Sequence, residues 1–254
     1  MKLTMKERLK NGEQLIGTMV SELRIPGVIR MLDTAGLDFV ILDAEHGPFN
    51  YESLADMAAV AGALNISCLT RVPEISRETI MKPLDMGMDG IVVPQVESAE
   101  QAEQIIEYAK YPPMGKRGVA LRRGHSAYAP YPAAEYLLRA NEKTLIAVQI
   151  ESPDAVARTE EIISVPGIDI AFVGPFDLSV AMGIPGDIGN EKLDCAIHAV
   201  IDTCKKKGIA AGLMQFSIES ARKWLAAGIG FMVYSSDVNM ITDQARSNVL
   251  ALHE

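Results

Sequence analysis

The sequence predicts a (β/α)8 barrel, an α/β fold in which eight parallel strands alternate with helices. Short runs of four to six apolar residues recur along the chain without polar alternation, as is typical of strands buried on both faces of a parallel sheet. Amphipathic stretches separate most of these runs. Eight such units within 254 residues match the usual size of this barrel.

The expected strands follow one another in the chain order that a barrel requires. They are the runs at 15–20, 38–42, 67–72, 89–94, 145–150, 168–173, 209–214 and 229–234. The clearest helical stretches lie at 52–64, 98–110 and 218–227. A glycine followed by the next strand is the pattern of a helix end in a βαβ unit, and it occurs at Gly36, Gly87, Gly167, Gly208 and Gly228.

A doubly wound open sheet is the alternative, and it would normally carry a glycine-rich fingerprint after its first strand. Residues 17–22 read GTMVSE instead, so the barrel is favoured. No linker or composition shift divides the chain, so we expect one domain over residues 1–254. The segment 111–144 is long, basic and rich in Pro, Gly and Tyr, which suits either a lid or an ordered excursion between strands.

Charge and composition exclude several classes of protein. Lys and Arg number 24 against 33 Asp and Glu, a net charge of −9, which argues against nucleic acid or an anionic membrane as main partner. No apolar run approaches the ~20 residues of a membrane span. The polar start MKLTMKERLKNGEQ lacks the apolar core of a secretory signal, and the three cysteines form no CxxC pair, so we expect a cytoplasmic protein.

Polar side chains follow nearly every expected strand. The C-terminal ends of barrel strands carry the chemistry of barrel enzymes, so we expect these groups to converge on one mouth. They are Asp43, Glu45, His46, Arg71, Gln95, Gln149, Glu151, Asp177, Gln215 and Asp237.

Glu151 and Asp177 follow consecutive strands, so their carboxylates can share one cation. Two carboxylates without His or Cys ligands suit a hard divalent ion such as Mg²⁺ or Mn²⁺. The alternative is that they cap the helices that follow them.

His46 and Arg71 are the other candidates for chemistry. His46 lies three residues after Asp43, and a carboxylate can orient an imidazole that acts as a general base; the alternative is a structural loop histidine. Arg71 ends a buried strand and therefore needs a partner, either an internal carboxylate or an anionic substrate such as an enolate. No lysine lies at the C-terminal end of a strand, which argues against Schiff-base chemistry.

Six motifs together resemble the HpcH/HpaI aldolase family. They are LDAEHGPFNYESL, LTRVPE, LDMGMDGIVVPQVESAEQA, YPPMGKRGV, VQIESPDAV and FVGPFDLSVAMG, in family order between about residues 15 and 240. Members are metal-dependent class II pyruvate aldolases with a phosphoenolpyruvate/pyruvate-binding type of barrel. They include enzymes that act on 2-keto-3-deoxy sugar acids or 2,4-dihydroxyhept-2-ene-1,7-dioate, and they are distantly related to the citrate lyase β subunit.

The resemblance implies a role for each matching residue. Glu151 and Asp177 would bind Mg²⁺, Mn²⁺ or Co²⁺, and Gln149 would orient the bound substrate or water. The backbone of Gly174, Pro175 and Phe176 would hold the pyruvate carboxylate, and Arg71 the keto or enolate oxygen. His46, oriented by Asp43, would be the base, with Glu45 supporting the site. Members are typically homo-hexamers, and Asp85 matches a residue that reaches a neighbouring subunit's site.

The expected reaction is the reversible cleavage of a 4-hydroxy-2-keto acid into pyruvate and an aldehyde through a metal-stabilised pyruvate enolate. Small molecules are then the expected substrates. Two alternatives stay open: an acyl-CoA lyase like the citrate lyase β subunit, and a non-catalytic barrel that binds keto acids. The chain departs from the family pattern in Arg122, Arg123 and His125 of a basic loop at 115–132, and in the bulky Phe176. These departures leave the identity of the aldehyde undetermined.

Overall fold

Eight parallel strands pair in chain order and close into a barrel in the computed structural model, which describes residues 3–253. The strands are β1 (Leu15–Val20), β2 (Phe39–Asp43), β3 (Ser67–Arg71), β4 (Gly90–Val93), β5 (Leu145–Ile150), β6 (Ile170–Val173), β7 (Ala210–Gln215) and β8 (Phe231–Ser236). Each begins and ends within two residues of its expected run. The predicted barrel is therefore confirmed.

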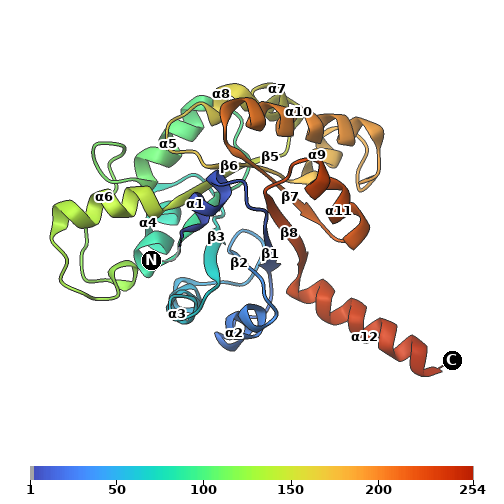
Figure 1. Cartoon of the computed structure of the whole chain (residues 1–254), viewed down its shortest axis with the longest axis horizontal. Coiled ribbons are helices and arrows are strands. Elements are labelled where there is room, and N and C mark those ends of the chain that lie inside the picture. Colours follow the sequence, from blue (N-terminus) through green and yellow to red (C-terminus); the bar gives the residue numbers. More distant parts are fainter. Residues whose placement is uncertain (1–2, 254) are drawn as a thin grey trace.

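Helices surround the barrel (Figure 1). They are α1 (Met5–Lys10), α2 (Gly27–Thr34), α3 (Tyr51–Ala61), α4 (Arg77–Met86), α5 (Ala99–Ala109), α6 (Ala133–Lys143), α7 (Pro153–Ala157), α8 (Thr159–Ile163), α9 (Pro175–Ala181), α10 (Glu191–Lys207), α11 (Ile218–Ala227) and α12 (Asp237–His253), with a 3-10 turn, η1 (Gly124–Ser126). Many begin where a side-chain oxygen accepts a free backbone N–H of the first turn. These N-cap residues include Asn50, Ser76, Ser98, Ser152 and Ser217.

Aromatic rings fill the barrel interior. The rings of Phe39 and Phe231 stack with centroids 4.1 Å apart, and Phe172 meets Phe231 edge-on at 6.0 Å. A side chain at Gly212 would place its Cβ 2.8 Å from the Phe172 ring, so glycine leaves the room that this ring needs. The interior is thus a packed core, and polar groups are left to the barrel ends.

The segment between β4 and β5 is an ordered excursion and not a lid over the mouth of its own barrel. It contains η1 and α6, and a Cβ on Gly87, just after α4, would lie 3.3 Å from the backbone of Gly124. The C-terminal end of α4 precedes β4, so this contact lies at the N-terminal end of the barrel.

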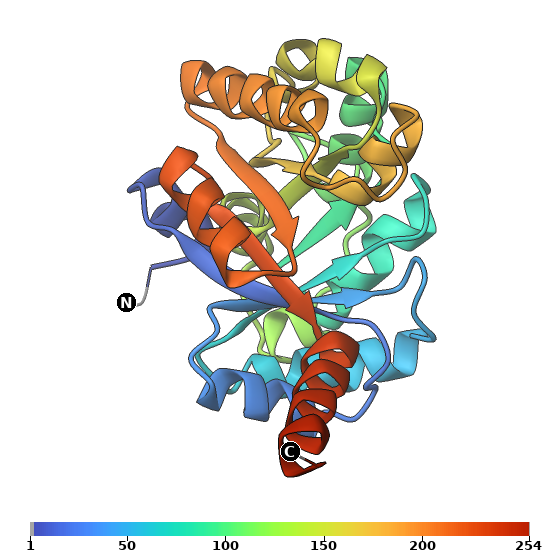
Figure 2. The same cartoon turned by 90° about the vertical axis from the view of Figure 1, so that its right-hand side faces the viewer.

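The helix α12 leaves the barrel. Figures 1 and 2 both show it projecting beyond the end of β8, and every described residue from Ile241 onward is exposed. Within residues 3–253, no helix combines the length and the apolar character that a membrane crossing needs.

Candidate active site

Arg71 is the cation at the C-terminal ends of the strands. Asp43 lies opposite Arg71 in the β2–β3 register. The guanidinium donates from Nε to Asp43 Oδ1 at 2.9 Å and from Nη2 to Oδ2 at 2.8 Å, and its Nε lies 3.2 Å from Glu45 Oε2. The partner that burial of Arg71 requires is therefore an internal carboxylate, Asp43, with Glu45 as a second one.

Glu151 is a buried acid of the site. It is 8% exposed, and it accepts hydrogen bonds from Gln149 Nε2 at 2.7 Å and from the Gln95 backbone N–H at 2.7 Å. Burial, together with the nearby charge of Asp177, raises the pKa of Glu151 to about 7 against the lowering effect of the Gln95 N–H. A buried acid with this environment is typical of a functional site.

The backbone at the start of α9 lies directly against Glu151. A Cβ on Gly174 would fall 2.5 Å from Glu151 Oε2, so only glycine lets the chain pass there. Gly174 is the N-cap of α9 and Ser152 is the N-cap of α7. The capping alternative for Glu151 and Asp177 is therefore not what the structure shows, and both carboxylates remain available for another partner.

His46 has a different surrounding from the one expected. Its side chain is 69% exposed, and its Nε2 lies 3.9 Å from Glu45 Oε2. Asp43 Oδ1 accepts the backbone N–H of His46 at 3.3 Å, and among the described residues no hydrogen bond joins Asp43 to the imidazole. In this structure Asp43 therefore holds the loop of His46 and does not orient its ring.

The donor set at Glu151 and Asp177 fits a hard divalent cation. All its candidate ligands are oxygens, and the buried Oε1 of Gln149 has no hydrogen-bond partner among the described residues. Residues 3–253 contain no group of three or more His, Cys, Asp or Glu side chains arranged around a common metal position. A cation here would therefore take few protein ligands and leave positions for water and substrate.

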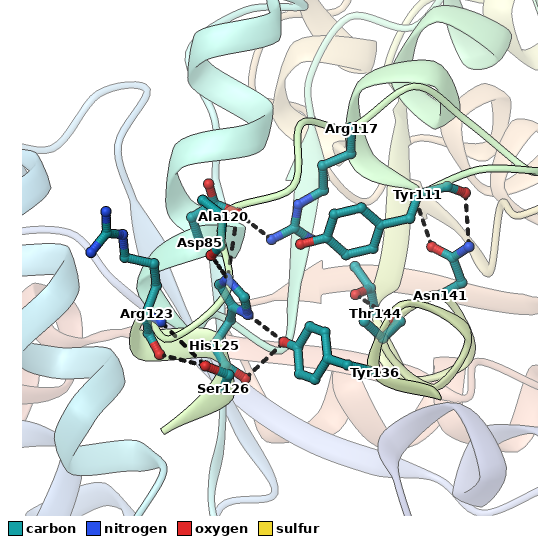
Figure 3. A network of polar contacts seen from close by, with 11 residues as sticks. Asp85, Tyr111, Arg117, Ala120, Arg123, His125, Ser126, Tyr136, Asn141 and Thr144 are labelled. Carbon is teal, nitrogen blue, oxygen red and sulfur yellow. Dashed lines mark hydrogen bonds and ion pairs between the residues drawn. The ribbon is translucent and has the colours of Figure 1, made fainter. Parts of the chain in front are cut away.

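Asp85 lies away from the mouth of its own barrel. It sits near the end of α4 and pairs with Arg117, whose Nη2 is 2.6 Å from Asp85 Oδ1 (Figure 3). His125 approaches the same carboxylate at 4.0 Å and hydrogen-bonds Tyr136 of α6. The basic loop thus surrounds Asp85 and does not line the mouth of its own chain.

Two groups at the mouth carry roles that the sequence did not assign. Gln95 adopts a φ of 53°, in the left-handed region, and this turn aims its N–H at Glu151. Asp237 is buried and accepts backbone N–H groups of the β1–α2 loop. Their positions after strands are visible in the sequence, but the backbone turn and the loop contact are not. Phe176, by contrast, is 58% exposed at the rim.

Comparisons with known proteins show the family to which the chain belongs. The family model described as HpcH/HpaI aldolase/citrate lyase matches residues 19–243. The hydroxypyruvate/pyruvate aldolase of Pseudomonas aeruginosa is 33% identical over 95% of this chain and 89% of its own length. The 2-keto-3-deoxy-L-rhamnonate aldolase of Escherichia coli (strain K12) is 31% identical over 94% of this chain and 88% of its own length.

A solved structure extends this likeness to three dimensions. The HpcH/HpaI aldolase from Desulfitobacterium hafniense DCB-2 superposes with a TM-score of 0.95 and 29% identity, covering 100% of this chain and 98% of that one.

Proposed function

Since this chain belongs to the HpcH/HpaI aldolase/citrate lyase family, we propose that it is a divalent-metal-dependent aldolase with a barrel of the phosphoenolpyruvate/pyruvate-binding type. The chain is an enzyme, a carbon–carbon lyase that acts as a pyruvate aldolase. Its reaction is the reversible cleavage of a 4-hydroxy-2-keto acid into pyruvate and an aldehyde. The observation that carries the metal proposal is the buried Glu151 carboxylate together with Gln149, whose Oε1 has no hydrogen-bond partner among residues 3–253.

Glu151 and Asp177 would hold the cation. When bound, a Mg²⁺, Mn²⁺ or Co²⁺ ion acts as a Lewis acid that polarises the keto group and acidifies the protons on C3. Gln149 is hydrogen-bonded to Glu151 and keeps that carboxylate in one orientation. The backbone of Gly174, Pro175 and Phe176 would receive the pyruvate carboxylate next to this pair of acids.

Arg71 stabilises the charge that develops on the keto oxygen. Its guanidinium is held by Asp43 through two parallel hydrogen bonds, so it is already oriented before substrate binds. A preorganised cation loses no orientational freedom in the reaction and can favour the enolate over the ketone.

His46 serves as the base in the cleavage direction. It removes the proton from the C4 hydroxyl, the C3–C4 bond breaks, and the electron pair passes to the keto oxygen to give the enolate. C4 leaves as the aldehyde, and C3 then takes a proton to give pyruvate. The His46 side chain is 69% exposed, so it can contact the aldehyde half of the substrate without any rearrangement of buried residues.

Metal removal and imine trapping test this mechanism together. We expect EDTA to abolish cleavage and added Mn²⁺ to restore it, whereas borohydride with pyruvate leaves the protein mass unchanged. The one fully buried lysine among the described residues, Lys110, bonds the carbonyls of Asn141 and Thr144 at the opposite end of the barrel. A pyruvate adduct on any lysine would contradict the metal-dependent class.

We also propose that the enzyme is a homo-oligomer, a hexamer by family likeness, and that it works in the cytoplasm. Support for assembly comes from apolar side chains of α12 that are exposed in the described part of the chain. They are Ile241, Val249, Leu250 and Leu252. Asp85 and the basic loop would then reach the mouth of a neighbouring subunit.

A further inference from the structure

A buried carboxylate outside the proposed chemistry lies where β1, β8 and α12 meet. Asp237 is the first residue of α12 and is 3% exposed. Its Oδ1 accepts the backbone N–H of Ser21 at 2.9 Å and of Val238 at 2.9 Å. Its Oδ2 accepts those of Glu22 at 3.1 Å and Leu23 at 2.8 Å. One side chain therefore fixes three consecutive residues of the β1–α2 loop.

This environment requires a carboxylate. All four hydrogen bonds come from backbone N–H groups, and none of the ion pairs among residues 3–253 involves Asp237. An asparagine would replace one of the two accepting oxygens by an NH₂ group, which would face two N–H donors. Each buried donor left without an acceptor costs about 1–3 kcal/mol.

The segment that Asp237 holds lies against the loop of His46. A Cβ on Gly47 would fall 2.6 Å from the carbonyl oxygen of Ser21, so the two loops touch through their main chains. A second contact joins them, since Arg24 Nη1 donates to the Pro48 carbonyl at 3.3 Å. Displacement of the first loop would therefore displace the second.

The imidazole of His46 has little else to hold it. Its approach to Glu45 at 3.9 Å is its one polar side-chain contact within the described part of the chain. The position of the ring is therefore set by the main chain of its loop, which Asp43 holds from one side and the Ser21 segment from the other.

We propose that Asp237 is a positioning residue for the reaction: it holds the loop that carries His46 and ties that loop to the base of α12. The proposal rests on the proposed function, in which His46 is the base. Because Asp237 begins α12, any partner that moves this helix would also act on the base.

Asp237→Asn tests the proposal. We expect kcat for aldol cleavage to fall by about 10²-fold, with a small change in KM for the keto acid, since a misplacement of about 1 Å can cost that much. The decisive measurement is the double variant with His46→Ala. Once the imidazole is absent its position no longer matters, so the double variant should have the same kcat as His46→Ala alone.

Asp38→Asn is the matched control. Asp38 accepts the backbone N–H of Ile16 at 2.9 Å at the other end of β1 and pairs with Arg8 at 2.7 Å. We expect it to lower the melting temperature and to leave kcat unchanged. Should Asp237→Asn not fold, Arg24→Met carries the same test, because it removes the hydrogen bond to the Pro48 carbonyl that joins the two loops while Asp237 stays intact.

The outcomes separate this proposal from the proposed function. If His46→Ala is impaired and the double variant has a kcat lower still by the full factor seen for Asp237→Asn, the positioning role alone would be overturned. Wild-type kcat in His46→Ala would overturn the base assignment and the positioning role with it. An unchanged kcat in Asp237→Asn would also refute the proposal.

Discussion

At the scale of single residues, the side chains of the site carry more negative than positive charge. Arg71 is set against Asp43 and Glu45, and Glu151 and Asp177 add two further carboxylates near it. Like charges so close raise the free energy of the folded state. A divalent cation between Glu151 and Asp177 would offset two of these negative charges, which is the physical basis of the proposed metal dependence.

Glu151→Gln and Asp177→Asn should each abolish metal-dependent turnover and leave the fold intact. Both substitutions remove a negative charge that would hold the cation, and neither removes an N-cap. Calorimetric titration with Mn²⁺ and the turnover of each variant check this. The assignment is wrong if either variant keeps wild-type turnover and metal affinity.

His46→Ala and Arg71→Ala should fail in different ways. Loss of the exposed imidazole removes a base that contributes about 10²–10⁴ in rate, so kcat falls with a modest change in KM. Loss of Arg71 removes the cation that stabilises the enolate, so Arg71→Ala should also slow deuterium uptake into the pyruvate methyl group. His46→Ala should retain part of this deuterium uptake.

Arg71→Lys serves as the control for folding. Arg71→Ala leaves Asp43 without its partner and costs about 3–5 kcal/mol of unfolding free energy, whereas lysine keeps the charge. Deuterium exchange at the wild-type rate in a folded Arg71→Ala protein would show that this arginine has a purely structural role.

At the scale of elements, continuous apolar runs predicted all the strands, because strands buried on both faces need apolar side chains throughout. The site was predicted less completely. Spacing along the chain brought Asp43 near His46, but it could not tell that Arg71, which lies opposite Asp43 on the next strand, takes both carboxylate oxygens. The left-handed turn at Gln95 could not be predicted, because the residue in this conformation is not a glycine.

The junction of α5 and α6 makes stability depend on pH. Lys110 is fully buried and donates to the carbonyls of Asn141 at 2.9 Å and Thr144 at 2.5 Å. Burial lowers its pKa from 10.5 to about 7, helped by Lys6 and opposed by Asp169. Between these two pKa values the unfolded chain binds one more proton than the folded chain, so this group makes stability rise with pH in that window.

Lys110→Met should remove that dependence. We expect the difference in unfolding free energy between wild type and variant to rise by about 1.4 kcal/mol per pH unit between roughly pH 7.5 and 9.5. Urea unfolding at three pH values measures it. A constant difference across the window would show that Lys110 stays charged in the folded protein.

At the scale of the whole molecule, two features of the chain suit contact with a second copy. The outer part of α12 carries exposed apolar side chains and projects away from the barrel (Figure 1). Asp85 and the basic loop lie at the opposite end of the barrel from the mouth. Both features are explained if a second copy covers α12 and receives Asp85 at its own site.

Mixing two inactive variants tests whether Asp85 acts in a neighbour's site. Asp85→Asn keeps its own Glu151, and Glu151→Gln keeps its own Asp85, so each variant alone should be inactive. If the proposed sharing of sites holds, random reassembly of an equal mixture gives about a quarter of the sites both an intact Glu151 and a neighbour's intact Asp85. Turnover after dissociation and reassembly should therefore approach that fraction of the wild-type value.

A mixture of Glu151→Gln with Asp177→Asn is the control, because both changes fall in the same chain's half of the site and no exchange can restore it. If the Asp85→Asn mixture stays as inactive as this control, Asp85 serves only its ion pair with Arg117.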